Sequence, residues 1–293
     1  MIKTPAMLPT VDTTNGKKKK VETKKVDADK LPLVKIQTGT TLDIFFPEQG
    51  INPCLVIFAG IPNSGKTTAA LKVAKSVAGK KKVLVIDTEA ATTTSPEYDK
   101  TKFEVYYTQD LKETEEFLKT KIDEIGRKYG ALIIDSISEQ GEDDDYMPEK
   151  LGDLRNLADR SKHLKAIKKM IRIATIEALE GKRDPFIAIG TSHIQKLVRP
   201  DIVDAATIID PVIDKNGNII GGYLWPASTG QVMEYLAGTI LLFKPDELRT
   251  KLDAKGRTYI TVTALKTRGV PKNLKAHLYI DSTGLHTDKS VKG

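Results

Sequence analysis

The chain has 293 residues and a formal net charge of +7, and 40% of its residues are hydrophobic. That length and apolar content allow a sizeable core in one or two domains. No apolar run approaches the ~18 residues of a membrane-spanning helix, and the single cysteine, Cys54, excludes a disulfide scaffold. These features predict a cytoplasmic protein in a reducing setting that has no membrane partner.

The first part of the chain is unusually basic. Residues 1–30 carry eight lysines against four acidic residues and contain no aromatic side chain. We expect residues 1–32 to form a disordered basic arm, 33–287 to form the folded core and 288–293 to be a short tail. The arm has two open interpretations, attraction to nucleic acid phosphates or a solubilising leader.

The most informative part of the folded region is a glycine-rich loop that lies between an apolar run and a helical pattern. An edge strand is predicted at 33–36 and a buried strand at 54–59, and helical spacing begins near Thr68. The stretch Gly60-Ile61-Pro62-Asn63-Ser64-Gly65-Lys66-Thr67 between them fits G-x-x-x-x-G-K-[ST]. In that motif backbone N–H groups and the helix N-terminus hold the phosphates of a nucleotide. Lys66 would contact the β- and γ-phosphates, and Thr67 would bind Mg²⁺.

Further strands follow at 83–86, 103–107 and 131–136, with helical spacing over 111–128. The last of these strands ends in Asp135. A carboxylate at the end of a parallel strand beside the phosphate loop can hold a water of the Mg²⁺ shell. The sequence therefore predicts ATP and Mg²⁺ as ligands, with Thr67 and Asp135 at the metal.

The second half begins with an acidic segment, 138–149, and a long helix near 151–180 that is apolar on one side and basic on the other. A fifth strand at 186–190 leads to His193. Asn216-Gly217 predicts a β-hairpin within the connection 195–229, and closing strands are predicted at 232–243, 259–265 and 277–280. Strands that alternate with helices predict an α/β fold, a mostly parallel twisted sheet flanked by helices.

Taken together, these stretches resemble the RecA-like P-loop ATPases, and among them the RecA and bacteriophage UvsX type of recombinase. Besides the phosphate loop, the resemblance rests on Ile36–Asp43, Ile86–Glu89, Ser228–Tyr235 and Ala264–Gly269. It covers about residues 33–287, and only the phosphate loop is specific by itself. The resemblance implies a RecA-like core with antiparallel closing strands, and the host cytoplasm as location if the protein is phage-encoded.

The resemblance also implies roles for particular residues. Glu89 would orient the attacking water, although an N-cap or surface acid is the alternative. Lys266 and Arg268 would reach the ATP site of a neighbouring subunit, or else form an ordinary pair at a strand end. His193 would sense the γ-phosphate, or be a satisfied strand-end histidine. Thr68 would belong to the ATP site, and Tyr98 would stack on adenine.

Single-stranded DNA is the partner that the resemblance implies. Because 138–149 is acidic where a first DNA-facing loop would lie, DNA would depend on other residues. Its candidate contacts are Lys196, Arg199 and Lys215, with Tyr223 and Trp225 as stacking surfaces. The two aromatic residues have an equally strong alternative, in which they pack the hairpin onto the core.

The sequence thus predicts a DNA-dependent ATPase that acts in recombination and repair and assembles head to tail. A ring-forming motor, such as a helicase or packaging ATPase, and a regulatory ATPase like KaiC remain alternatives. A small-molecule kinase is disfavoured because no arginine-rich lid follows the fourth strand.

Overall fold

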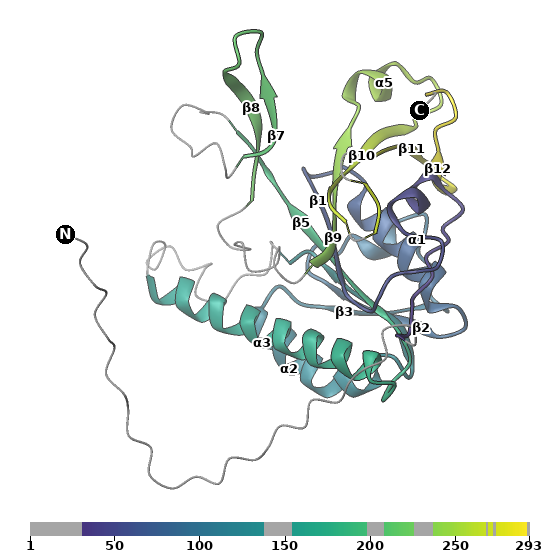
Figure 1. The fold of residues 1–293 in the computed structure, drawn as a ribbon, viewed down its shortest axis with the longest axis vertical. Helices are drawn as coiled ribbons and strands as arrows, with labels where there is room; N and C mark the ends of the chain where they lie inside the picture. Colours follow the sequence, from purple (N-terminus) through teal and green to yellow (C-terminus); the bar gives the residue numbers. More distant parts are fainter. Residues whose placement is uncertain are drawn as a thin grey trace, which may run out of the picture. The chain divides into compact units, whose positions relative to one another are not determined.

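The computed structural model describes residues 31–137, 154–197, 208–225, 237–267, 269–271 and 274–291, with only the backbone described for 154–161. Its main feature is a nine-stranded sheet in the order β12-β11-β10-β9-β1-β5-β4-β2-β3 (Figure 1). The strands are β1 (Leu55–Gly60), β2 (Lys82–Asp87), β3 (Phe103–Tyr107), β4 (Tyr129–Asp135), β5 (Ile187–His193), β9 (Ala237–Pro245), β10 (Thr258–Lys266), β11 (Lys275–Asp281) and β12 (Gly284–Thr287).

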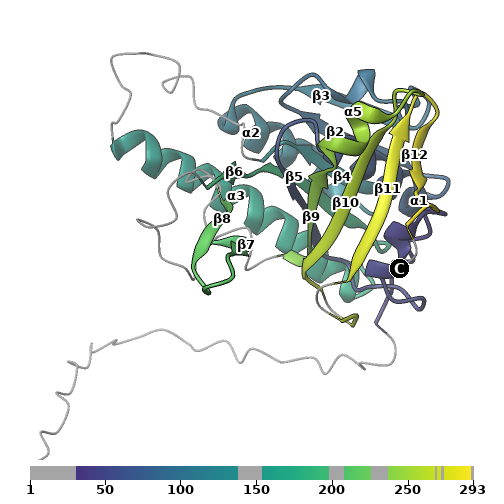
Figure 2. The ribbon, with the colours of Figure 1, turned by 90° about the horizontal axis from the view of Figure 1, so that it is seen from above.

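The sheet has a parallel and an antiparallel part. The strands β9, β1, β5, β4, β2 and β3 pair in parallel, whereas β9 to β12 pair antiparallel. Figure 2 shows these last four strands side by side. The prediction of a mostly parallel sheet with antiparallel closing strands is confirmed.

Helices cover the two faces of the parallel part. The helix α1 (Lys66–Ala78) and the 3-10 helix η2 (Thr41–Phe45) pack on one face, together with Val56 and Phe58 of β1. The helices α2 (Leu111–Lys121) and α3 (Leu154–Leu179) pack on the other face, with Leu55 and Ile57. Because β1 is buried on both faces, its sequence is a continuous apolar run.

A small second sheet has the order β6-β8-β7, formed by β6 (Gln195–Lys196), β7 (Ile209–Ile213) and β8 (Ile219–Leu224). The hairpin of β7 and β8 turns at Asn216-Gly217, as predicted. Asp214 fixes the turn because its Oδ1 accepts hydrogen bonds from the backbone N–H groups of Asn216 and Asn218.

Some elements differ from the predictions. The edge strand predicted at 33–36 is reduced to one bridge between Val34 and Ile51. The sequence pattern does not predict η2, β12 or the short elements α5 (Glu247–Leu252), η3 (Thr92–Thr94) and η4 (Ile122–Glu124). The predicted arm, the acidic segment 138–149 and the stretch 228–235 lie outside the described residues, except that the arm's last two residues are described. Within the described residues, no helix is long and apolar enough to span a membrane.

Candidate active site

The phosphate loop joins the end of β1 to the start of α1, and its two glycines are sterically required. A Cβ at Gly60 would lie 2.6 Å from the backbone oxygen of Phe243. Gly65 has φ of +81°, and a Cβ there would lie 2.5 Å from Cδ1 of Ile260 and 2.6 Å from Cδ1 of Ile280. The loop therefore keeps its path only with glycine at both positions.

The positive end of α1 opens onto this loop. No side chain caps the first turn of α1, so its N–H groups are available to an anion. Lys66 is almost fully buried, and its Nζ donates a hydrogen bond to the backbone oxygen of Ile61, 2.9 Å away. The hydroxyl oxygen of Ser64 is buried in the loop without a hydrogen-bond partner. These are the groups that a phosphate chain would engage.

Asp135 ends β4 and is buried next to this loop. Thr191 of β5 donates a hydrogen bond to its Oδ1, and its Oδ2 has no partner. Burial raises the pKa of Asp135 to about 6, opposed by the hydroxyls of Thr191 and Thr67 and reinforced by the nearby charges of Glu89 and Asp87.

An orphaned carboxylate oxygen near the Thr67 hydroxyl fits a Mg²⁺ ion with its waters. Among the residues that the structure describes, no group of three or more His, Cys, Asp or Glu could hold a metal by itself. A site of one hydroxyl and one carboxylate is what a nucleotide-bound Mg²⁺ needs, because phosphates and waters supply its remaining ligands.

The loop after β2 is built around Asp87. Its Oδ1 accepts a hydrogen bond from the N–H of Glu89, and its Oδ2 accepts one from the N–H of Thr92. Thr88 ties this loop to β4. Its N–H donates a hydrogen bond to the backbone oxygen of Asp135 at 2.6 Å, and its hydroxyl accepts one from the N–H of Ser136. The side chain of Glu89 is thereby held at the same edge of the sheet as Asp135.

Glu89 and His193 meet at this edge, although 104 positions separate them in the chain. Oε1 of Glu89 lies 2.7 Å from Nε2 of His193. This contact and the charge of Lys66 lower the pKa of Glu89, while burial opposes the shift. Glu89 is therefore a carboxylate at neutral pH, the form that can accept a hydrogen bond from water.

Lys66, Thr67, Glu89 and His193 line a cavity of about 370 Å³, whereas Asp135 is buried behind its lining. The predicted residues that line it are Pro62, Asn63, Ser64, Gly65, Lys66, Thr67, Thr68, Glu89 and His193. Six further residues line the cavity that no sequence motif predicts: Ala91, Thr94, Ser95, Pro96, Thr258 and Ile280. Residues 91–96 follow Glu89 closely, but nothing near Thr258 or Ile280 in the sequence points to a nucleotide.

Tyr98 does not line this cavity. It is partly buried against the core on the α1 face, and its ring stacks on that of Phe103 with 6.0 Å between centroids. The predicted adenine contact gains no support from this position.

Lys266 lies far from the cavity of its own chain. It ends β10, whereas Thr258 at the start of β10 lines the cavity. Lys266 lies eight positions beyond Thr258, which in an extended strand is a distance of about 27 Å. Lys266 therefore cannot reach its own site, and Arg268 lies outside the described residues.

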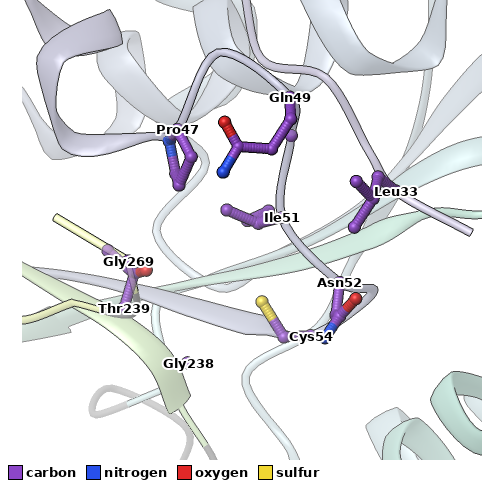
Figure 3. A pocket seen from close by; sticks show the side chains of 10 residues that line it. Leu33, Pro47, Gln49, Ile51, Asn52, Cys54, Gly238, Thr239 and Gly269 are labelled. Atoms are coloured by element: carbon purple, nitrogen blue, oxygen red, sulfur yellow. The ribbon is translucent and has the colours of Figure 1, made fainter. Parts of the chain in front are cut away.

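A second cavity, of about 350 Å³, lies at the opposite end of β1, between the segment 47–54 and the start of β9 (Figure 3). Among the described residues its lining includes the Cys54 thiol and the amides of Gln49 and Asn52, but no charged side chain. It has nothing to neutralise a phosphate chain, so the cavity at the phosphate loop is the nucleotide candidate.

The predicted DNA contacts divide into two groups. Lys196 and Lys215 are exposed, on β6 and in the hairpin turn. Tyr223 and Trp225 are partly buried against a cluster of Ala59, Ile194, Ile209 and Leu242. Arg199 lies outside the described residues. The two aromatic residues thus contribute to packing, as the alternative interpretation expects.

Comparisons with known proteins agree with this geometry at the level of the fold. The family model "chromatin associated protein KTI12" matches residues 54–138, less than a third of the chain but including the phosphate loop, Glu89 and Asp135. A crystal structure of the RadB recombinase is similar with a TM-score of 0.55 and 20% identity, over 87% of this chain and 100% of that one. No curated protein matches the sequence. The fold is therefore RecA-like, and no finding singles out the UvsX type.

Proposed function

We propose that this chain is an ATPase of the RecA type that binds single-stranded DNA with ATP and acts in homologous recombination and DNA repair. Subunits assemble head to tail, with ATP at the interface between them. The observation that carries the proposal is the convergence of Lys66, Thr67 and Glu89 on one cavity, with the buried carboxylate of Asp135 next to Thr67.

Each of these residues has a role that follows from its position. The loop N–H groups and Lys66 bind the phosphates, and Thr67 and Asp135 hold Mg²⁺, which neutralises phosphate charge when bound. Glu89 accepts a hydrogen bond from the attacking water, and its contact with His193 fixes the direction of its carboxylate.

The connection from His193 to the small sheet supports coupling to DNA. Only two residues separate His193, which lines the cavity, from Lys196 on β6. Between them Ile194 packs in the same cluster as Tyr223 and Trp225. A change at Glu89 would therefore reach Lys196 through a packed segment, and Lys196 and Lys215 would contact DNA phosphates.

The position of Lys266 supports head-to-tail assembly. Since it lies about 27 Å along β10 from its own cavity, it can act on a nucleotide only in another subunit. Together with Arg268 it would neutralise charge in the transition state of that subunit.

The test is ATP hydrolysis with and without single-stranded DNA, at low and moderate salt. The unmodified chain is compared with Glu89→Gln and with Glu116→Gln, a control carboxylate that is exposed on α2. We expect DNA to stimulate hydrolysis in the unmodified chain and in Glu116→Gln. Glu89→Gln should bind ATP but lose hydrolysis by ~10²-fold or more.

Hydrolysis that ignores DNA would contradict the proposal and favour a regulatory ATPase like KaiC. Stimulation by DNA in closed rings, seen by electron microscopy with ATP bound, would favour a ring-forming helicase or packaging motor. Phosphate transfer to a small molecule would indicate a kinase.

A further inference from the structure

The solvent side of α3 carries a row of positive charges that the nucleotide site does not use. Lys162, Lys165, Lys169 and Arg172 are all exposed. Their spacing of three, four and three residues places them on one side of the helix. The stretch 162–172 contains no acidic residue, and α3 contributes no described residue to the nucleotide cavity.

These four cations have no ion-pair or hydrogen-bond partner among the described residues. The neighbouring helix α2 is different, because its Lys119 pairs with Glu115 and its Lys121 pairs with Glu124. An ordinary solvated helix face mixes both signs of charge, as α2 does. The row on α3 does not.

Like charges at this spacing oppose the helix, by a few tenths of a kcal/mol for each pair. Burial, and after it the charge of Lys165, lower the pKa of the neighbouring Lys168. The helix is held in place by Leu164, Ile167, Ile171 and Ala174 on its buried side. The positive row is therefore carried at a cost, which a bound polyanion would remove.

The dimensions of the row fit a DNA backbone. From Lys162 to Arg172 the helix rises about 15 Å, and phosphates of one DNA strand follow each other every ~3.4 Å along the duplex axis. No aromatic side chain lies in the stretch 162–172. Single-stranded DNA is usually held by stacking on aromatic residues, whereas a duplex presents its phosphates and keeps its bases inside.

We propose that this face of α3 binds the phosphate backbone of double-stranded DNA, through cations that do not line the nucleotide cavity. Contacts of this kind recognise charge and spacing but not base sequence. The site depends neither on ATP hydrolysis nor on the single-strand surface, so it stands apart from the function proposed above.

The test replaces the row in the full chain by Lys162→Gln, Lys165→Gln, Lys169→Gln and Arg172→Gln. A control of equal charge replaces four scattered, exposed lysines by Lys80→Gln, Lys100→Gln, Lys112→Gln and Lys255→Gln. Binding of a labelled duplex and of a single strand of the same length is measured by fluorescence anisotropy over a series of salt concentrations. Circular dichroism melting of both variants checks that they fold.

We expect the row variant to bind the duplex at least ~10-fold more weakly at moderate salt. The slope of log K against log salt should become shallower by about 3–4, close to 0.9 for each lost contact. The control should change duplex affinity less than ~3-fold, and the row variant should keep its single-strand affinity and its ATP hydrolysis. If the row variant bound the duplex as tightly as the unmodified chain while ATP hydrolysis stayed DNA-dependent, this inference would fail and the function proposed above would stand.

Two other results would overturn it. Equal losses in the row variant and the control would mean that only net charge matters, and an equal loss of single-strand binding would make the surface unspecific for duplex. The exposed Ile173 directly follows Arg172, and the exposed Ile176 lies one turn beyond Arg172 on α3. If Ile173→Ser with Ile176→Ser changed the mass of the assembled protein in solution while the row variant left duplex binding intact, the face would be a protein interface.

Discussion

Asp135 combines a functional position with an unfavourable environment for its charge. Its folded pKa of about 6 exceeds the ordinary value of ~3.9. Between these values the folded state binds more protons than the unfolded state, so stability falls as pH rises through this window. Below it both states are protonated, and the penalty is absent.

We therefore predict that, in the presence of a metal chelator at pH 7.5, Asp135→Asn stabilises the protein by on the order of 3 kcal/mol. Near pH 4 the difference should shrink toward zero. Chemical denaturation at both pH values measures it. If Asp135→Asn instead destabilised the protein at pH 7.5, the hydrogen bonds from Thr191 and Thr67 to the carboxylate would contribute more stability than burial of its charge costs.

Asp87 holds the backbone at Glu89, because its Oδ1 accepts a hydrogen bond from the Glu89 N–H. Asp87→Asn removes one acceptor oxygen, so the turn that also uses the Thr92 N–H loses a hydrogen bond. We expect kcat for ATP to fall about 10-fold or more while KM changes less than ~3-fold. An equal change in both would mean that the turn serves nucleotide binding.

The residues that the sequence identified are those with local signals. Lys66 and Thr67 belong to one eight-residue motif, and Asp135 and Glu89 each follow an apolar strand. Thr258 and Ile280 line the same cavity, but they come from strands about 200 residues beyond the phosphate loop. Only the fold brings them there. Tyr98 follows the loop that carries Glu89, yet its ring stacks on Phe103 and packs against the core, away from the cavity.

At the scale of elements, the long apolar strands and amphipathic helices were predictable because their periodicity is strong. The strand β12 has four residues and α5 has six, too few for a pattern to stand out. The segment 33–36 has the composition of a strand, but it pairs only at Val34, while Val34 and Ile36 are buried in the core cluster on the α1 face. Tertiary packing decided its conformation.

The contact of α1 with β4 depends on a glycine. A Cβ at Gly130 would lie 2.6 Å from the Cα of Ala78 and 3.1 Å from its backbone oxygen. Because backbone cannot move aside as a side chain can, Gly130→Ala should destabilise the protein by about 1–3 kcal/mol. Thermal melting would measure the effect.

Gly221→Ala is the matched control, since its nearest contact would be the Val212 side chain at 3.7 Å. We expect it to leave stability within ~0.5 kcal/mol. If both variants melted alike, close packing at Gly130 would not be what limits the approach of α1.

At the scale of the whole molecule, Lys66 and Lys266 occupy opposite ends of the sheet. Head-to-tail assembly then predicts that two inactive variants complement each other. Lys66→Ala and Lys266→Ala should each lose hydrolysis alone. Mixed in equal amounts before assembly, they should recover up to about a quarter of the activity, because about one interface in four pairs two intact halves.

The control for this experiment is a mixture of Lys66→Ala with Glu89→Gln, whose defects lie on the same side of the interface. It should recover nothing. Recovery there, or none in the first mixture, would contradict action of Lys266 on a neighbouring subunit.

Thr258 and Ile280, which form one wall of the cavity, are synthesised long after the phosphate loop. The phosphate loop is translated early, but Gly65 packs against Ile260 and Ile280. A ribosome that has made only the first half of the chain has therefore produced the motif without its enclosure. If nucleotide binding depends on this wall, the nascent chain should reach full affinity for nucleotide only after β10 and β11 have emerged and joined the sheet.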